Sequence, residues 1–187
     1  MPPARQKPED TPDAHIFLDM DGVIADIETH GHTHNKFAAD GRLDYDALDF
    51  KWWSGVPEFN GAYDFFKKLQ KRGTVRFLSG PIPSAACYGG KAEWVKKFAR
   101  ERGKWAILDL MIVRSRDKEL IAGPDRILID DRQDNIAAWE KAGGIGIHHD
   151  GDFNKTLQKL DAVMKTHGLK WPKPRQRFKR QPAPKAF

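Results

Sequence analysis

Short runs of consecutive apolar residues alternate along this chain with segments whose apolar residues recur at helical spacing. The apolar runs lie at residues 16–18, 74–78, 110–113, 127–129 and 145–147. The segments with helical spacing lie at residues 61–72, 91–102 and 135–142. Because strand-like and helix-like segments alternate, the pattern predicts an α/β fold built on a parallel sheet.

Polar side chains follow three of these runs. Asp19 and Asp21 come after the first run, Ser79 after the second, and Asp130 and Asp131 after the fourth. The carboxyl ends of parallel strands meet at one edge of a sheet, so we expect these side chains to share one crevice. Four carboxylates in one pocket repel each other unless a cation lies among them. Oxygen ligands of this kind suit Mg²⁺.

The order of these segments resembles the haloacid dehalogenase-like (HAD) superfamily of phosphatases, and within it most closely the 5′(3′)-deoxyribonucleotidases. The similar segments are residues 19–26, 78–82, 91–98, 116–118 and 128–132. The resemblance spans residues 16–147 and implies a three-layer α/β/α Rossmann-like core with a small helical cap inserted after the first strand. The implied division is a flexible N-terminus, a catalytic core, a cap and a tail, at residues 1–14, 15–27 with 61–164, 28–60 and 165–187.

The resemblance also implies phosphoryl transfer through an aspartyl-phosphate. Asp19 would attack phosphorus, which divides one difficult step into two easier ones. Asp21 would protonate the leaving oxygen and then activate the hydrolytic water. That role needs a protonated Asp21 at neutral pH, which we expect the neighbouring carboxylates to favour. Mg²⁺ would be held by Asp19, the backbone carbonyl of Asp21, Asp130 and Asp131.

Hydroxyl, amide and ammonium groups would hold the phosphate. By the same resemblance, Ser79 and the backbone amide of Gly80 would donate hydrogen bonds to its oxygens. The family often has a second hydroxyl where this chain has Gly80. Lys118 is the better candidate for the lysine beside the nucleophile, and Lys91 would reach the same ligand from the other side.

The segment between residues 28 and 60 would form the cap, with helices at residues 29–39 and 45–53. A cap excludes water and recognises the leaving group, so substrate preference should depend on it. Trp52 and Trp53 align with the part of the nucleotidase cap that contacts the base, although tryptophans in a small cap also serve as its hydrophobic core. Ile27 occupies a position where these nucleotidases often carry a phenylalanine.

Three histidines in this segment, His30, His32 and His34, invite a metal site. Residues two apart do not share a helix face, so such a site would need an irregular backbone. An ordinary cap surface is the simpler interpretation.

The charge is uneven along the chain. Residues 165–187 contain eight Lys/Arg and no acids, and subtracting these from the net charge of +6 leaves −2 for the rest. A basic, proline-rich tail with interleaved aromatic residues could bind nucleic acid, serve as a solubilising extension or pack across the domain. The single cysteine, Cys87, fits a reducing cytoplasm. No apolar stretch indicates a secretory signal or membrane span, so we expect a cytoplasmic protein without a membrane partner.

We therefore predict a Mg²⁺-dependent phosphatase of nucleoside monophosphates, with 5′- or 3′-deoxyribonucleotides as the preferred class. The alternative is a polynucleotide 3′-phosphatase acting on DNA or RNA ends, because those enzymes have a similar Ile-Asp-Asp-Arg segment and a later Gly-Asp-Phe, here residues 151–153. A catalytically idle binding module is disfavoured by the complete set of acids and lysines. The oligomeric state is left open.

Overall fold

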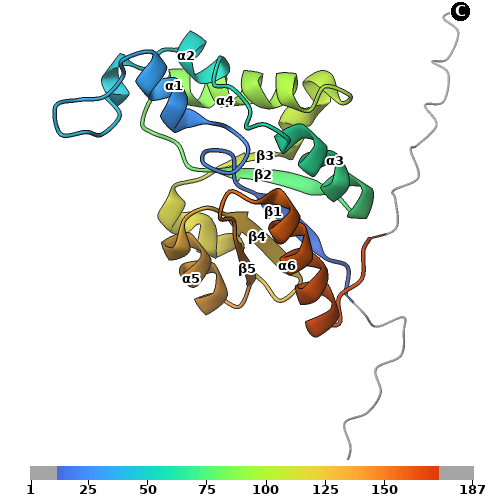
Figure 1. Cartoon of the computed structure of the whole chain (residues 1–187). Coiled ribbons are helices and arrows are strands. Elements are labelled where there is room, and N and C mark those ends of the chain that lie inside the picture. The colour runs from blue at the N-terminus through green and yellow to red at the C-terminus, as the bar shows by residue number, and fades with distance from the viewer. Residues whose placement is uncertain (1–11, 173–187) are drawn as a thin grey trace, which may run out of the picture.

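The computed structural model describes residues 12–172. Its centre is a parallel sheet of five strands in the order β3-β2-β1-β4-β5. The strands are β1 (His15–Leu18), β2 (Val75–Ser79), β3 (Leu110–Ile112), β4 (Arg126–Asp130) and β5 (Ile145–His148). The α/β fold with a parallel sheet is thus confirmed (Figure 1).

Alternation along the strands divides the core between the two faces of the sheet. Ile16 and Leu18 belong to the larger apolar cluster, whereas Phe17 between them belongs to a smaller one. The larger cluster receives α3 (Ala62–Arg72), α4 (Ala85–Phe98) and α6 (Phe153–Thr166). The smaller cluster receives α5 (Gln133–Lys141) and the 3₁₀ helix η4 (Ser115–Ile121). Helices on both faces give the three layers that were predicted.

Helix α4 begins earlier than the sequence indicated. The predicted start at Lys91 follows two glycines, but Gly89 and Gly90 lie inside the helix, which begins at Ala85 and ends at Phe98. These glycines allow α2 (Phe50–Ser54) to pack closely, because a Cβ built on Gly90 would lie 2.3 Å from the Cβ of Trp53. A 3₁₀ helix, η3 (Gly103–Asp109), follows α4 and leads to β3.

The helices of the segment between β1 and α3 are shorter than predicted. Helix α1 (Ile27–Thr33) is capped by Asp26, which accepts a hydrogen bond from the backbone amide of Thr29. The chain then turns through Asn35, whose φ is +49°, in place of continuing the helix. The single predicted helix over residues 45–53 is divided into η2 (Tyr45–Ala47) and α2, since Asp49 caps α2 by accepting from the amide of Trp52 at 2.7 Å.

The two ends of the described chain lie together. Helix α6 continues to Thr166, and the backbone amide of Ala14 donates to the carbonyl of Lys170 at 2.9 Å. Leu169 and Trp171 pack against the larger apolar cluster. The first eight residues of the predicted tail, up to residue 172, therefore belong to the packed structure. The remaining tail and residues 1–11 lie outside the described residues. Between residues 12 and 172, no helix has the length and apolar character needed to cross a membrane.

Candidate active site

Three carboxylates meet at the carboxyl ends of two neighbouring strands. Asp19 follows β1 directly, Asp130 is the last residue of β4, and Asp131 comes next. The chain leaves β1 for strands on one side, while β4 lies on its other side, which is where open α/β sheets bind ligands. One carboxylate oxygen from each of the three residues lies within 4.8 Å of the others. The predicted convergence of these acids is therefore present in the structure.

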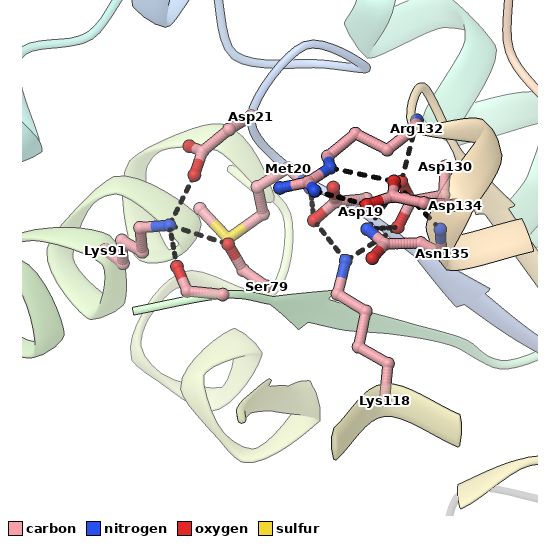
Figure 2. A network of polar contacts seen from close by, with 11 residues as sticks. Asp19, Met20, Asp21, Ser79, Lys91, Lys118, Asp130, Arg132, Asp134 and Asn135 are labelled. Carbon is pink, nitrogen blue, oxygen red and sulfur yellow. Dashed lines mark hydrogen bonds and ion pairs between the residues drawn. The ribbon is translucent and has the colours of Figure 1, made fainter. Parts of the chain in front are cut away.

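Lys118 joins two of these acids. Its ammonium group lies 3.0 Å from Oδ1 of Asp19 and 2.7 Å from Oδ2 of Asp130, and its side chain is buried (Figure 2). Burial alone would lower the pKa of Lys118, but the two carboxylates raise it above its ordinary value. Lys118 therefore carries a full positive charge beside Asp19, which is the position that the sequence predicted for it.

Asp130 accepts further hydrogen bonds besides the one from Lys118. The side-chain amide of Asn135 donates to both of its carboxylate oxygens at 3.0 Å, and the backbone amide of Arg132 donates to Oδ1 at 2.9 Å. Asn135 lies on α5 and was not recognised in the sequence, where it belongs to an ordinary helical pattern. These bonds fix the orientation of a fully buried carboxylate, so Asp130 presents its oxygens toward Asp19.

The site carries more negative than positive charge. Burial raises the pKa of Asp19 from its ordinary 3.8 to about 7; Lys118 opposes this effect, and Asp130 and Asp21 add to it. Burial together with the charge of Asp130 also raises the pKa of Asp131. Clustered carboxylate oxygens with excess negative charge fit a hard divalent cation, and this donor set suits Mg²⁺. Asp19, Asp130 and Asp131 could therefore hold a metal.

Lys91 organises a second group of polar atoms beside the first. Its ammonium group donates to Oδ2 of Asp21 at 2.5 Å, to the hydroxyl of Ser79 at 2.7 Å and to the carbonyl of Gly80 at 2.7 Å (Figure 2). All three of its N–H bonds are used in this way. The nearest charged partner of Asp21 is thus a cation, whereas the sequence had suggested crowding by other carboxylates. Asp19 and Asp21 face different lysines.

A cavity of about 450 Å³ opens beside both groups. Its lining combines the acids Asp19, Asp21 and Asp131 with apolar and aromatic side chains from the segment between β1 and α3. The apolar and aromatic residues are Ile27, Leu43, Tyr45, Trp53 and Phe59. Gly80 and Ser115 also line it. Tyr45, Phe59 and Ser115 were not singled out in the sequence, since no local pattern separates them from other cap or loop residues.

The two tryptophans predicted to contact a base are separated. Trp53 lines the cavity beside Asp19 and lies under the ammonium group of Lys91, 5.2 Å from its ring centre. Trp52 lines a different cavity, of about 720 Å³, together with His30 and His34. Both tryptophans are almost completely buried. The structure therefore brings only Trp53 to the candidate site.

The histidines of the same segment are held by ordinary contacts. His30 shares a hydrogen bond with the carbonyl of Trp52 at 3.2 Å, and its ring lies against that of His34. Within residues 12–172, the three acids described above are the group whose atoms are close enough to hold a metal, and the histidines form no such group. His30 is buried, so it belongs to the packing of this segment and not to its surface.

Known proteins resemble this chain in structure but not closely in sequence. No protein-family model matches the chain, and no curated protein matches it. Among solved structures it is similar to the HAD domain of the effector protein Lem4 from Legionella pneumophila, with 13% identity, a TM-score of 0.44 and coverage of 84% of this chain and 98% of that one. It is also similar to an uncharacterized protein from Corynebacterium glutamicum, with 14% identity, a TM-score of 0.42 and coverage of 85% and 98%. Similarity at this level does not establish a shared family or activity.

Proposed function

We propose that this protein is a Mg²⁺-dependent phosphatase of the HAD type that hydrolyses nucleoside monophosphates, with 5′- or 3′-deoxyribonucleotides as the preferred class. The observation that carries the proposal is the meeting of Asp19, Asp130 and Asp131 around the ammonium group of Lys118. A buried cluster of this kind is costly unless the charges serve a ligand, and perturbed acids beside a cavity are typical of catalytic sites.

Asp19 is the nucleophile in this proposal. One of its carboxylate oxygens forms a bond to phosphorus while the bond from phosphorus to the ester oxygen breaks. Lys118 holds Asp19 in place and offsets negative charge that develops on the phosphoryl oxygens. Its rigid contact with Asp130 keeps the ammonium group in position without reorganisation during the reaction.

Asp21 carries the proton in this proposal, which requires its carboxyl group to leave the ion pair with Lys91 when substrate binds. It gives a proton to the departing ester oxygen and later takes one from the water that attacks the aspartyl-phosphate, which regenerates Asp19 and releases phosphate. The side chain of Asp21 is 29% exposed and lines the cavity, whereas that of Asp19 is 8% exposed. This difference suits an acid that meets both the leaving group and water.

Asp19, Asp130 and Asp131, with the backbone carbonyl of Asp21, are the groups that would hold Mg²⁺. When bound there, Mg²⁺ supplies positive charge that neutralises the nucleophile and the phosphoryl oxygens together. Ser79 and the amide of Gly80 provide hydrogen bonds to the phosphate, and Lys91 positions the Ser79 hydroxyl.

The lining of the cavity supports a substrate with a flat apolar part. Ile27, Tyr45, Trp53 and Phe59 supply the kind of surface on which a nucleobase packs. Tyr45 is half exposed at the edge of the cavity, so its ring is free to contact a ligand. These contacts distinguish a nucleotide from a small sugar phosphate.

The test is phosphate release from a panel of substrates by the full chain, with and without Mg²⁺. The panel contains nucleoside 5′- and 3′-monophosphates, sugar phosphates and 3′-phosphorylated oligonucleotides, and Asp19→Asn is the control for contaminating activity. We expect Mg²⁺-dependent release from nucleoside monophosphates that the variant lacks. Equal release by the variant would exclude Asp19 as nucleophile, and faster turnover of sugar phosphates would exclude the substrate class.

A polynucleotide 3′-phosphatase remains the second candidate, and one feature of the structure favours it. A cavity of about 530 Å³, lined by Arg114, Arg116 and Arg132, shares Ser115, Arg132 and Asn135 with the cavity beside Asp19. Glu119 and Asp134 also line this cavity, and Arg132 pairs with Asp134, so its lining carries only a small excess of positive charge. Further phosphates of a strand could lie along its arginines. Under this hypothesis Arg116→Ala lowers turnover of 3′-phosphorylated oligonucleotides but not of mononucleotides.

The Gly-Asp-Phe segment gives this second candidate no support beyond resemblance. Asp152 caps α6 by accepting from the backbone amides of Asn154 and Lys155. The ring of Phe153 stacks on that of Phe65. These contacts explain the segment as part of the fold.

A further inference from the structure

Ser115 lies on the side of η4 that faces the acids. It is the first residue of this 3₁₀ helix, three positions before Lys118. Side chains three apart on a 3₁₀ helix lie one above the other, so Ser115 shares the face from which Lys118 reaches Asp19 and Asp130. The segment is also tied to β2, because the backbone amide of Val113 donates to the carbonyl of Ser79 at 3.1 Å.

The Ser115 hydroxyl occupies the space beside Gly80. A Cβ built on Gly80 would lie 2.6 Å from Oγ of Ser115, closer than real atoms approach. The backbone of Gly80 is not in the left-handed region, so its conformation does not itself require glycine. A side chain at position 80 would therefore require the Ser115 hydroxyl to move.

Both residues line the cavity beside Asp19. We propose that Ser115 is a substrate-binding residue whose hydroxyl donates a hydrogen bond to a phosphoryl oxygen in this cavity. The inference rests on the proposed phosphatase function. It assigns phosphate recognition to two hydroxyls from different elements, Ser79 at the end of β2 and Ser115 on η4.

The experiment compares Ser115→Ala with the full wild-type chain, using p-nitrophenyl phosphate as substrate and inorganic phosphate as competing ligand. Loss of a hydrogen bond to a charged oxygen should lower kcat/KM about 10- to 100-fold and weaken inhibition by phosphate. Ser84→Ala is the matched control. Ser84 precedes α4, makes no side-chain cap and does not line the cavity, so its removal should leave both constants unchanged.

A second test of the same assignment moves the hydroxyl group from position 115 to position 80. Gly80→Ser alone should lose activity, because its side chain collides with the Ser115 hydroxyl. Combining it with Ser115→Ala removes the collision and restores a hydroxyl, so the double variant should be more active than either single variant. Relief of the collision alone would raise the double variant only above Gly80→Ser, so the decisive comparison is with Ser115→Ala, which the double variant exceeds only if the restored hydroxyl binds phosphate. Ser115→Cys, which keeps the size but donates a weak hydrogen bond, serves if the alanine variant unfolds.

The outcomes separate the inference from the function on which it rests. If the wild-type chain releases phosphate but Ser115→Ala keeps its kcat/KM and phosphate inhibition, the assignment of Ser115 is wrong. A double variant no more active than Ser115→Ala also overturns it. If the wild-type chain releases phosphate from no substrate and binds no phosphate, the proposed function itself fails.

Discussion

Gly22 and Asp131 touch across the candidate site. A Cβ built on Gly22 would lie 2.3 Å from Oδ2 of Asp131, and the φ of Gly22 is +77°. The turn that follows Asp19 and Asp21 therefore packs directly against the side chain of Asp131. Glycine is required here both by the backbone conformation and by the close approach.

Gly22→Ala should consequently weaken Mg²⁺ binding in addition to lowering the free energy of unfolding. The substitution strains the backbone by about 1–3 kcal/mol and displaces Asp131 from its place beside Asp130. We expect a fall in phosphate release of at least about tenfold, with a higher Mg²⁺ concentration for half-maximal activity. The measurement is a Mg²⁺ titration of activity together with urea unfolding.

The control for backbone strain is Gly41→Ala. Gly41 has nearly the same φ, +79°, but no atom lies within 4 Å of its built Cβ. It should lose similar stability while keeping the Mg²⁺ dependence of the wild type. An equal shift in Mg²⁺ dependence for the two variants would contradict the contact between Gly22 and Asp131.

Asp19→Asn should abolish turnover but stabilise the metal-free fold at neutral and alkaline pH. The pKa of Asp19 is raised from 3.8 to about 7, so the folded chain binds a proton more tightly than the unfolded chain. The ionised group therefore lowers the free energy of unfolding as the pH rises from about 4 to 7. Replacing it with a neutral amide removes this cost.

The measurement is urea unfolding of both proteins in EDTA between pH 4 and pH 8. The advantage of Asp19→Asn should be largest at pH 8 and vanish toward pH 4, and Mg²⁺ should stabilise the wild type more than the variant. A variant less stable than the wild type at pH 8 in EDTA would show that the pairing of Asp19 with Lys118 outweighs its burial.

Lys118→Met should destabilise the metal-free protein strongly. It leaves Asp19 and Asp130 buried without their shared cation, and breaking a buried pair costs about 3–5 kcal/mol. Mg²⁺ should recover part of this loss by supplying positive charge, while activity stays low. Thermal unfolding with and without Mg²⁺ measures both effects.

Lys96→Met is the comparison for Lys118→Met. Lys96 pairs with Glu93 on the partly exposed surface of α4, and an exposed pair contributes at most about 1 kcal/mol. If the two lysine variants lose equal stability, the buried network does not depend on Lys118 as described.

Gly90→Ala and Gly89→Ala should act in opposite directions. Alanine is favoured over glycine inside a helix by about 1 kcal/mol, and a Cβ on Gly89 would meet Phe50 only at 3.4 Å. A Cβ on Gly90 would collide with Trp53 and push α2 away from α4, which should cost about 1–3 kcal/mol. Because Trp53 lines the cavity, Gly90→Ala should also raise KM for nucleotides more than for p-nitrophenyl phosphate.

Urea unfolding and steady-state kinetics of the two variants provide the test. Destabilisation by both substitutions, or by neither, would mean that α2 does not approach α4 closely at Gly90.

The sequence predicted the sheet and the acids because both depend on short-range patterns. An apolar run with alternating faces defines a strand, and residues at the ends of parallel strands meet regardless of the loops between them. Asp19 and Asp130 could therefore be brought together without knowledge of the packing, whereas Lys118 was placed beside them by the resemblance alone. Their catalytic roles remain predictions.

Features that depend on contacts between distant elements could not be predicted in this way. Gly89 and Gly90 resemble a helix boundary in the sequence, yet they lie inside α4 where α2 packs. Ser115 becomes part of the cavity only through the 3₁₀ geometry of η4 and its contact with Gly80. Trp52 and Trp53 line different cavities although they are adjacent in sequence. Successive residues of a helix point in directions about 100° apart, so the two rings lie on different sides of α2.

The pairing of Asp13 with Lys170 lies at the amino end of β1, whereas Asp19 follows its carboxyl end. The described chain consequently begins and ends at the sheet edge remote from the cavity. A fluorescent reporter joined directly to residue 12 or residue 172 should therefore leave substrate entry open. The same proximity makes the fold a good candidate for circular permutation, with a linker joining the two ends and new termini opened at Gly41.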